Sequence, residues 1–208
     1  MSEVPFSNAD QATLKSPETR KQIVDAAAHL LNVRGVAATK LTDVVEYTQM
    51  QPAVTYYHFD SFRDLLEEVL YTGITQMRSY LEKALEALPP DTSPVDRLMV
   101  AVETHIRREL ELSDYGRAWT LNFAHIPGGL TRRLRTEEAA YGRIWRNLFN
   151  DAIAGSTITP GVDPRMARRL MLGAMNSATE WFDPRRGSLD TLVTTTQQLI
   201  RNCLPSST

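Results

Sequence analysis

The sequence predicts an all-α protein of about nine helices, and three kinds of observation support this fold class. Apolar residues recur every three or four positions along most of the chain, as they do on the buried face of an α-helix. Capping residues, prolines and glycines separate these periodic segments. The strongest strand candidate, the β-branched run 193–196, lies inside a helical pattern.

The expected helices begin with a segment that has both a start and a stop signal. Ser16 can cap this helix, Pro17 suits its first position, and Gly35 is expected to end it in the left-handed conformation. A later helix begins after Ser61, which forms a capping-box-like pair with Asp64, and ends before two prolines. The predicted helices are 17–34, 41–48, 52–59, 61–88, 94–112, 114–125, 130–154, 164–181 and 188–203.

Composition narrows the class of protein. The chain has 208 residues, is 42% hydrophobic and 23% charged, and carries a formal net charge of -2. No stretch is apolar and long enough to cross a bilayer, and the first 15 residues do not resemble a secretory signal. One cysteine, Cys203, excludes an internal disulfide framework and a multi-cysteine metal site. We therefore expect a cytoplasmic protein with no cofactor and no metal.

Residues 41–59 have the anatomy of a helix-turn-helix. Two short helices are joined by a tight turn at 48–50, and the helix 17–34 supports them. In such a module the second helix enters the major groove of DNA. We expect residues 1–60 to form a tail and a DNA-binding domain, and residues 61–208 to form a domain for effector binding and dimerisation.

Residues 18–70 resemble the DNA-binding domain of TetR-family transcriptional regulators. The matching stretches are 19–27, 34–39, 41–45 and 56–61. The resemblance implies a homodimeric repressor that leaves a palindromic operator when a small hydrophobic molecule enters the C-terminal domain. It places phosphate or base contacts at the following positions: Thr39, Thr42, Gln51, Pro52, Ala53, Thr55, Tyr56, Tyr57 and His58. Independently of the resemblance, Lys40 and Thr42 lie where the first helix of the pair is expected to meet the DNA backbone.

Several residues depart from the family pattern. Gln49 stands where glycine is usual and is expected to adopt a left-handed conformation at some cost. Gln51 replaces the usual serine cap, and Phe62 replaces a phosphate-binding lysine for which Arg63 is the candidate substitute. Residues 1–60 hold five basic and seven acidic side chains, so we expect a modest salt dependence of DNA binding. Phe59 is expected to be core.

Aromatic, sulfur-containing and polar residues of the C-terminal part predict an effector pocket, because such pockets are mainly apolar with a few polar groups. The candidates are His105, Trp119, Asn122, Phe123, Tyr141, Trp145, Met171, Met175 and Asn176. The same stripes also fit plain core packing. We expect the ligand to lie between the helix 61–88 and the helices near residues 119 and 145, and to shift the long helix.

Arginines are frequent between residues 107 and 146. Because arginine binds phosphate groups, an anionic effector such as an acyl-coenzyme A is an alternative to a neutral one. Interspersed glutamates, Glu109 among them, favour ordinary solvated faces. His105 and Glu109 are four residues apart, and a surface pair explains this spacing better than a metal site. The final third of the chain is also similar, more weakly, to TetR-type regulators of lipid or steroid catabolism.

The last two predicted helices carry small and apolar residues on one face, as expected for close helix packing. The resemblance implies that they form a four-helix interface between two subunits. The candidate interface residues are Gly173, Ala174, Ser177, Ala178, Leu192, Thr196 and Leu199.

Two other function classes stay open at this point. A helical enzyme is disfavoured, because the nucleophile-elbow, zinc-protease, P-loop and dinucleotide-binding motifs are absent from the sequence. The other class is a helical protein that binds DNA weakly and acts through protein contacts. Phe62 at the usual lysine position and the acidic N-terminal module favour this class.

Overall fold

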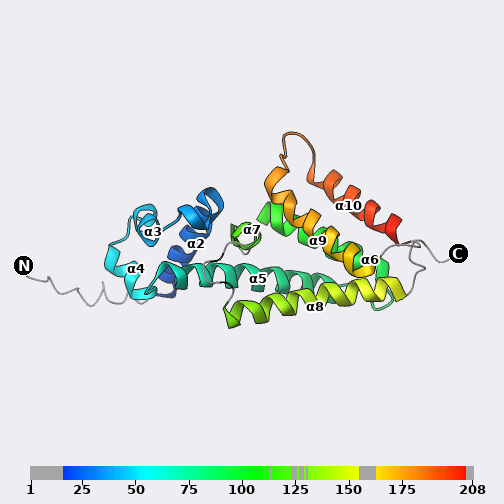
Figure 1. Ribbon diagram of the computed structural model, residues 1–208, viewed down its shortest axis with the longest axis horizontal. Helices are drawn as coiled ribbons and strands as arrows, with labels where there is room; N and C mark the ends of the chain where they lie inside the picture. The colour runs from blue at the N-terminus through cyan, green and yellow to red at the C-terminus, as the bar shows by residue number, and fades with distance from the viewer. Residues whose placement is uncertain are drawn as a thin grey trace, which may run out of the picture.

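The computed structural model describes residues 16–112, 114–122, 131–154 and 163–204, together with Ile126 and Gly129. Every regular element in these ranges is helical, which confirms the predicted fold class. The molecule is elongated (Figure 1). Helices α2, α3 and α4 lie at one end, α5 runs along the middle, and α8 lies alongside α5.

The N-terminal end is built from α2 (Pro17–Arg34), the 3-10 turn η1 (Val36–Ala38), α3 (Leu41–Thr48) and α4 (Pro52–His58). These four elements are called the head module below. The bounds confirm the predicted helices, and the Ser16 hydroxyl accepts a hydrogen bond from the Glu18 amide as a cap. Gly35 does end α2, but its φ of 74° and ψ of 167° lie outside the left-handed helical region that was predicted. Only glycine adopts this backbone conformation readily.

The long helix α5 (Phe62–Glu86) connects the head module to the rest of the molecule. Ser61 caps it by accepting a hydrogen bond from the Asp64 amide, as the sequence predicts. Its buried side packs against α7 (Asp114–Asn122) and α8 (Arg132–Ala154) as well as α2. Helix α5 therefore contacts elements at both ends of the molecule.

The predicted helix 94–112 is in fact two elements. The α-helix α6 ends at Arg107 after beginning at Pro94, and a π-helix, η2, continues over Arg108–Leu112. The wider turns of a π-helix change which side chains point to a given face. The remaining elements are α9 (Pro164–Trp181) and α10 (Leu189–Cys203), so the run 193–196 is helical.

Two hydrophobic clusters hold the described residues together. One joins the head module to the first half of α5 and to α7, and includes Phe59 and Trp119. The other joins the second half of α5 to α6, α8, α9 and α10. Within the described ranges, none of the helices is long and apolar enough to span a membrane.

Candidate functional sites

The turn between α3 and α4 has the conformation that the sequence predicts. Gln49 has a φ of 55° and a ψ of 21°, in the left-handed region that glycine occupies more readily. Gln51 precedes α4 as its N-cap residue, and its side chain makes no capping hydrogen bond. Pro52 compensates in part, because its fixed φ suits the first position of a helix.

The outer surface of α4 exposes two large aromatic side chains. Tyr56 is 48% exposed and Tyr57 is 56% exposed, although tyrosine usually buries much of its ring. Phe59, in contrast, is 4% exposed and belongs to the core, as predicted. The predicted contact residues that are exposed in the structure are Lys40, Thr42, Gln51, Pro52, Ala53, Tyr56, Tyr57 and Arg63.

Two of the predicted DNA-contact residues have buried side chains. Thr55 is fully buried, and its position in the seven-residue helix α4 faces the core. Thr39 is 4% exposed, and its hydroxyl donates a hydrogen bond to the Gly35 carbonyl at 2.8 Å. Neither hydroxyl can meet a phosphate without a rearrangement of the head module.

The predicted contact residue His58 is neither fully exposed nor fully buried. Its ring is half-buried and packs edge-on against Tyr57, with 5.2 Å between the ring centroids. Its Nε2 atom is buried without a hydrogen-bond partner among the described residues. This nitrogen would reach a phosphate only after the ring turns outward.

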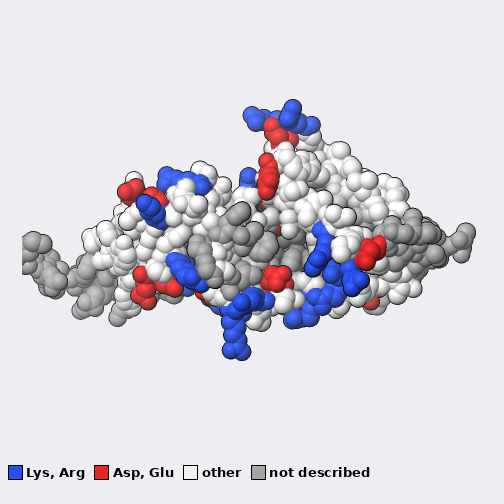
Figure 2. Space-filling model, in the orientation of Figure 1, with Lys and Arg blue, Asp and Glu red and all other residues white. Residues whose placement is uncertain are grey.

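Ion pairs already engage most of the positive charge of the head module. Lys21 pairs with Asp25 at 2.7 Å, and Arg34 lies 3.6 Å from Asp43. Figure 2 shows basic and acidic residues interspersed over the end of the molecule that holds α2–α4, with no broad basic surface on this face. Lys40 beside α3 and Arg63 at the start of α5 are the exposed cations closest in sequence to the two short helices.

A cavity of about 150 Å³ lies in the C-terminal part, between α5, α7, α8, α9 and the α6–η2 segment. Five of the predicted effector-binding residues line it: His105, Trp119, Tyr141, Trp145 and Asn176. It is also lined by Ile74, Met77, Glu109, Thr120, Glu138, Gly142 and Leu172. The cavity lies between the long helix and the helices that carry residues 119 and 145, where the sequence predicts a ligand.

His105 is the centre of a buried hydrogen-bond chain in this cavity. Its Nε2 lies 2.9 Å from the Asn176 side-chain oxygen, and its Nδ1 lies 2.8 Å from the Tyr141 hydroxyl. Because an amide oxygen only accepts, Nε2 carries the proton and Nδ1 accepts from Tyr141. Burial lowers the pKa of His105 to about 4, against the opposing effect of Asn176, so the ring is neutral at pH 7.

Glu109 is the functional candidate that sequence reasoning missed. It is 3% exposed, so the predicted surface pair with His105 is wrong, and both residues line the cavity. The Thr120 hydroxyl donates to its Oε1 at 2.7 Å, while Oε2 is buried without a partner among the described residues. Burial raises the pKa of Glu109 to about 7, although Thr120 and Arg117 favour its charged form.

Other predicted effector residues lie elsewhere. Met171 and Met175 line a groove between α9 and α10 instead of the cavity. Asn122 does not line the cavity; it is buried about one turn beyond Trp119 on α7, where its side chain accepts a hydrogen bond from the Val36 amide at 2.9 Å. Phe123 lies outside the described residues.

Helix α7 connects the cavity to the head module. Trp119 and Thr120 line the cavity, and Asn122, one turn or less beyond them, holds the backbone of η1. At the other end of α7, Asn32 donates hydrogen bonds to the Asp114 carbonyl at 3.0 Å and to its carboxylate at 2.8 Å. The same helix therefore contacts both the cavity and the head module, through α2 and η1.

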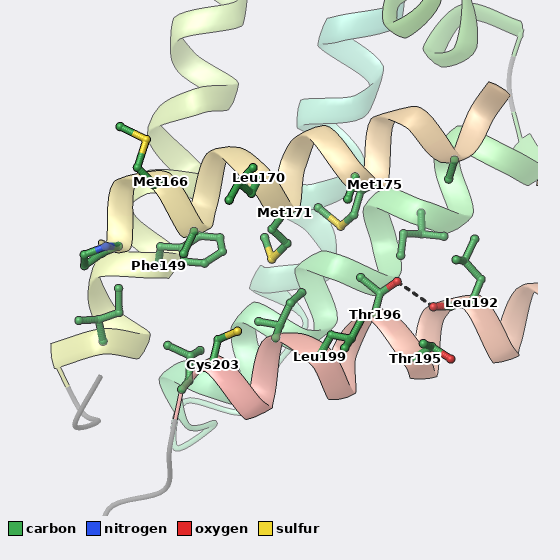
Figure 3. A pocket seen from close by; sticks show the side chains of 18 of the residues that line it. Phe149, Met166, Leu170, Met171, Met175, Leu192, Thr195, Thr196, Leu199 and Cys203 are labelled. Carbon is green, nitrogen blue, oxygen red and sulfur yellow. Dashed lines mark hydrogen bonds between the residues drawn. The ribbon is translucent and has the colours of Figure 1, made fainter. Parts of the chain in front are cut away.

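The groove between α9 and α10 has a volume of about 640 Å³ and is almost entirely apolar (Figure 3). Its edges carry large exposed side chains, with Leu170 75% and Leu199 63% exposed. The predicted interface residues that line it are Ala174, Ala178, Leu192, Thr196 and Leu199. Gly173 is exposed on α9, and Ser177 accepts a hydrogen bond from the Trp181 indole.

Two family models match the chain. Residues 23–69 match the bacterial regulatory proteins of the tetR family, and residues 91–199 match the tetracyclin repressor-like C-terminal domain. The HTH-type transcriptional repressor KstR2 of Mycolicibacterium smegmatis is 21% identical over 177 residues, which is 83% of each chain.

Solved structures share the fold. The ketosteroid transcriptional regulator KstR2 of Mycobacterium tuberculosis superimposes with a TM-score of 0.75 at 15% identity, over 93% of this chain and 98% of that one. AibR in complex with isovaleryl coenzyme A and operator DNA gives a TM-score of 0.73 at 18% identity, over 91% and 100% of the two chains. With both of its parts matched by family models, the chain belongs to the TetR family of transcriptional regulators.

Proposed function

We propose that the protein is a dimeric repressor that binds a palindromic operator through α4 and is released when a ligand enters the 150 Å³ cavity. The observation that carries this proposal is the position of α7. This helix presents Trp119 and Thr120 to the cavity and Asn122 to the backbone of the head module. A ligand that displaces α7 would therefore move the head module directly.

The effect on DNA follows from geometry. The two α4 helices of a dimer must lie about 34–36 Å apart to enter successive major grooves on one face of DNA. A movement of α7 would act on the head module through Asn122 and Asp114, and on α5 through their packed interface. A changed separation of the heads weakens binding at both half-sites at once.

The proposed operator contacts are the exposed side chains of the two short helices. Gln51 can form a paired hydrogen bond with adenine, and Tyr56 can contact a thymine methyl or a phosphate. Lys40, Thr42 and Arg63 are placed to meet the DNA backbone. Because few cations of the head are unpaired, we expect affinity to fall less steeply with salt than is usual for repressors.

Fluorescence anisotropy with DNA from immediately upstream of the protein's own gene tests this proposal. We expect saturable binding that unrelated DNA does not compete away, measured over a series of salt concentrations. Binding that is weak, indifferent to sequence and lost near physiological salt would instead favour a protein that acts through protein contacts.

Asn122→Ala tests the coupling within the protein. The substitution removes the acceptor for the Val36 amide. Hydrogen exchange should then become faster at Val36 in the ligand-free protein, and a bound effector should release DNA less completely. Asn202→Ala, at an exposed position near the end of α10, is the matched control. Unchanged exchange and unchanged release in Asn122→Ala would contradict transmission through α7.

An acyl-coenzyme A is a second candidate effector, favoured by the structural similarity to AibR, whose structure contains isovaleryl coenzyme A. A cavity of about 150 Å³ admits a molecule of roughly benzene's size, so only the acyl end would fit inside. Calorimetric titration of the protein with isovaleryl coenzyme A, with free coenzyme A as the control, tests this candidate.

A further inference from the structure

The charged residues that line the 150 Å³ cavity are all acidic. Glu109 and Glu138 contribute carboxyl groups, and among the described residues no lysine or arginine lines the cavity. Glu138 is exposed at the edge, whereas Glu109 is buried. A cavity of this composition repels anions and attracts positive charge.

Glu109 lines this space and carries a hydrogen-bond acceptor that no described residue uses. Its Oε1 accepts from Thr120, and its Oε2 is buried without a partner among the described residues. A buried carboxylate oxygen of this kind is costly unless a donor reaches it. Glu109 lies in the π-helix η2, and π-helical turns occur frequently at functional sites.

Aromatic rings form much of the remaining wall. Trp119, Tyr141 and Trp145 line the cavity, and the Tyr141 and Trp145 rings pack edge to face with 6.3 Å between their centroids. The faces of such rings attract cations, and tryptophan does so most strongly. His105 does not oppose this attraction, because burial lowers its pKa and keeps it neutral.

The other groups around Glu109 do not change the attraction of the cavity for positive charge. The Arg117 side chain on α7 favours the charged form of Glu109 and donates a hydrogen bond to the Thr179 carbonyl. Helix α9 presents Asn176 to the cavity, and α5 presents the uncharged Ile74 and Met77. A positive charge inside the cavity would therefore face the Glu109 carboxylate as its main partner.

We propose that the cavity binds a small organic cation, an aryl- or alkylammonium of about benzene's size with at least one N–H group. The ammonium would donate to the Glu109 carboxylate, and its apolar part would lie among Trp119, Tyr141 and Trp145. That this ligand is also the effector rests on the proposed function, but its binding to the cavity does not.

Calorimetric titration of the full-length protein with three ligands of one shape tests this inference. The probes are benzylammonium, benzyl alcohol and benzoate, which differ in charge at a similar size. At pH 8, where Glu109 is ionised, we expect benzylammonium to bind at least tenfold more tightly than the alcohol, and benzoate not to bind. At pH 6 the affinity for benzylammonium should be several-fold weaker, because protons compete for Glu109.

Glu109→Gln keeps the shape of the side chain and its acceptor for Thr120 but removes the charge. The preference for benzylammonium over benzyl alcohol should disappear in this variant and persist in Glu86→Gln, an exposed control on α5. Equal binding of the alcohol and the ammonium by the wild-type protein, a preference for benzoate, or no binding of the three would overturn the inference, even if Glu109→Gln fails to fold. Operator binding without ligand is measured separately, so its failure would affect only the proposed repressor function.

Discussion

Gly73 of α5 lies directly against the backbone carbonyl of Tyr115 in α7. A Cβ atom at position 73 would overlap that carbonyl oxygen and would also approach the Trp119 Cβ to 3.3 Å. Backbone atoms cannot rotate away as the end of a flexible side chain can. This glycine therefore fixes how closely α7, which contacts both the cavity and the head module, packs on α5.

Gly73→Ala should destabilise the protein, even though alanine favours helices. Overpacking costs about 1–3 kcal/mol, which outweighs the roughly 1 kcal/mol that alanine contributes in a helix interior. Gly142→Ala is the matched control in α8, because nothing lies within 4 Å of its added Cβ, and it should be neutral or stabilising. Urea unfolding at one fixed protein concentration measures both variants, and equal stability of Gly73→Ala and wild type would contradict the close packing.

The pH dependence of stability should reveal the buried state of Glu109. Burial raises its pKa from 4.5 to about 7, so the folded protein binds more protons than the unfolded chain between these values. The contribution of Glu109 to the free energy of unfolding therefore falls as pH rises from 4.5 to 7, by about 3 kcal/mol. Glu109→Gln should consequently be about 2–3 kcal/mol more stable than wild type at pH 8, with the difference fading towards pH 4.5.

His105 acts in the opposite direction over nearly the same range. Burial lowers its pKa from 6.5 to about 4, so its contribution is present above pH 6.5 and is lost as pH falls to 4. In the wild type the opposite contributions of Glu109 and His105 to the free energy of unfolding nearly cancel. In Glu109→Gln only the His105 contribution remains, so the stability of this variant should fall as the pH is lowered from 6.5 to 4. Urea unfolding at several pH values measures the difference, with Glu86→Gln as the control. A pH-independent difference between wild type and Glu109→Gln would contradict the raised pKa.

The sequence predicts the helices well because their signals are local. Caps such as Ser16 and Ser61, and breakers such as Gly35, act on neighbouring backbone and need no knowledge of tertiary contacts. The start of the π-helix at Arg108 has no such signal. The i, i+4 spacing correctly places Glu109 on the same side as His105. The sequence does not show that this side is buried, which is why the spacing was interpreted as a surface pair.

Some predicted effector residues lie outside the cavity because nearby residues of one helix contact different partners. Trp119 and Asn122 lie three residues apart on α7, yet one lines the cavity and the other holds the Val36 backbone. Met171 and Asn176 divide similarly on α9, between the α9–α10 groove and the cavity. Hydrophobic periodicity marks a buried face but does not say what covers it.

Substitutions in α4 should distinguish its exposed side, which is proposed to contact DNA, from its buried side. Tyr56→Ala removes a 48% exposed side chain, and we expect operator affinity to fall at least tenfold, about 1.4 kcal/mol. Thr55→Val is the matched control, because the residue is fully buried and its hydroxyl has no partner among the described residues. It should leave affinity unchanged and stabilise the fold slightly. Anisotropy and thermal unfolding measure the two effects, and a large loss of affinity in Thr55→Val alone would reverse the assignment of the helix faces.

The apolar groove between α9 and α10 should be the dimer interface, and a charge placed there should separate the subunits. Leu199 is 63% exposed and lines the groove, so in a two-fold dimer Leu199→Glu would bury two carboxylates in an apolar contact. We expect sedimentation velocity to show a dimer for wild type and a monomer for this variant at micromolar concentration. Val33→Glu is the control, because Val33 is 67% exposed on α2, away from the groove. If Leu199→Glu stays dimeric while its helices remain folded, the subunits must associate through another surface, and the groove must then be covered by something else.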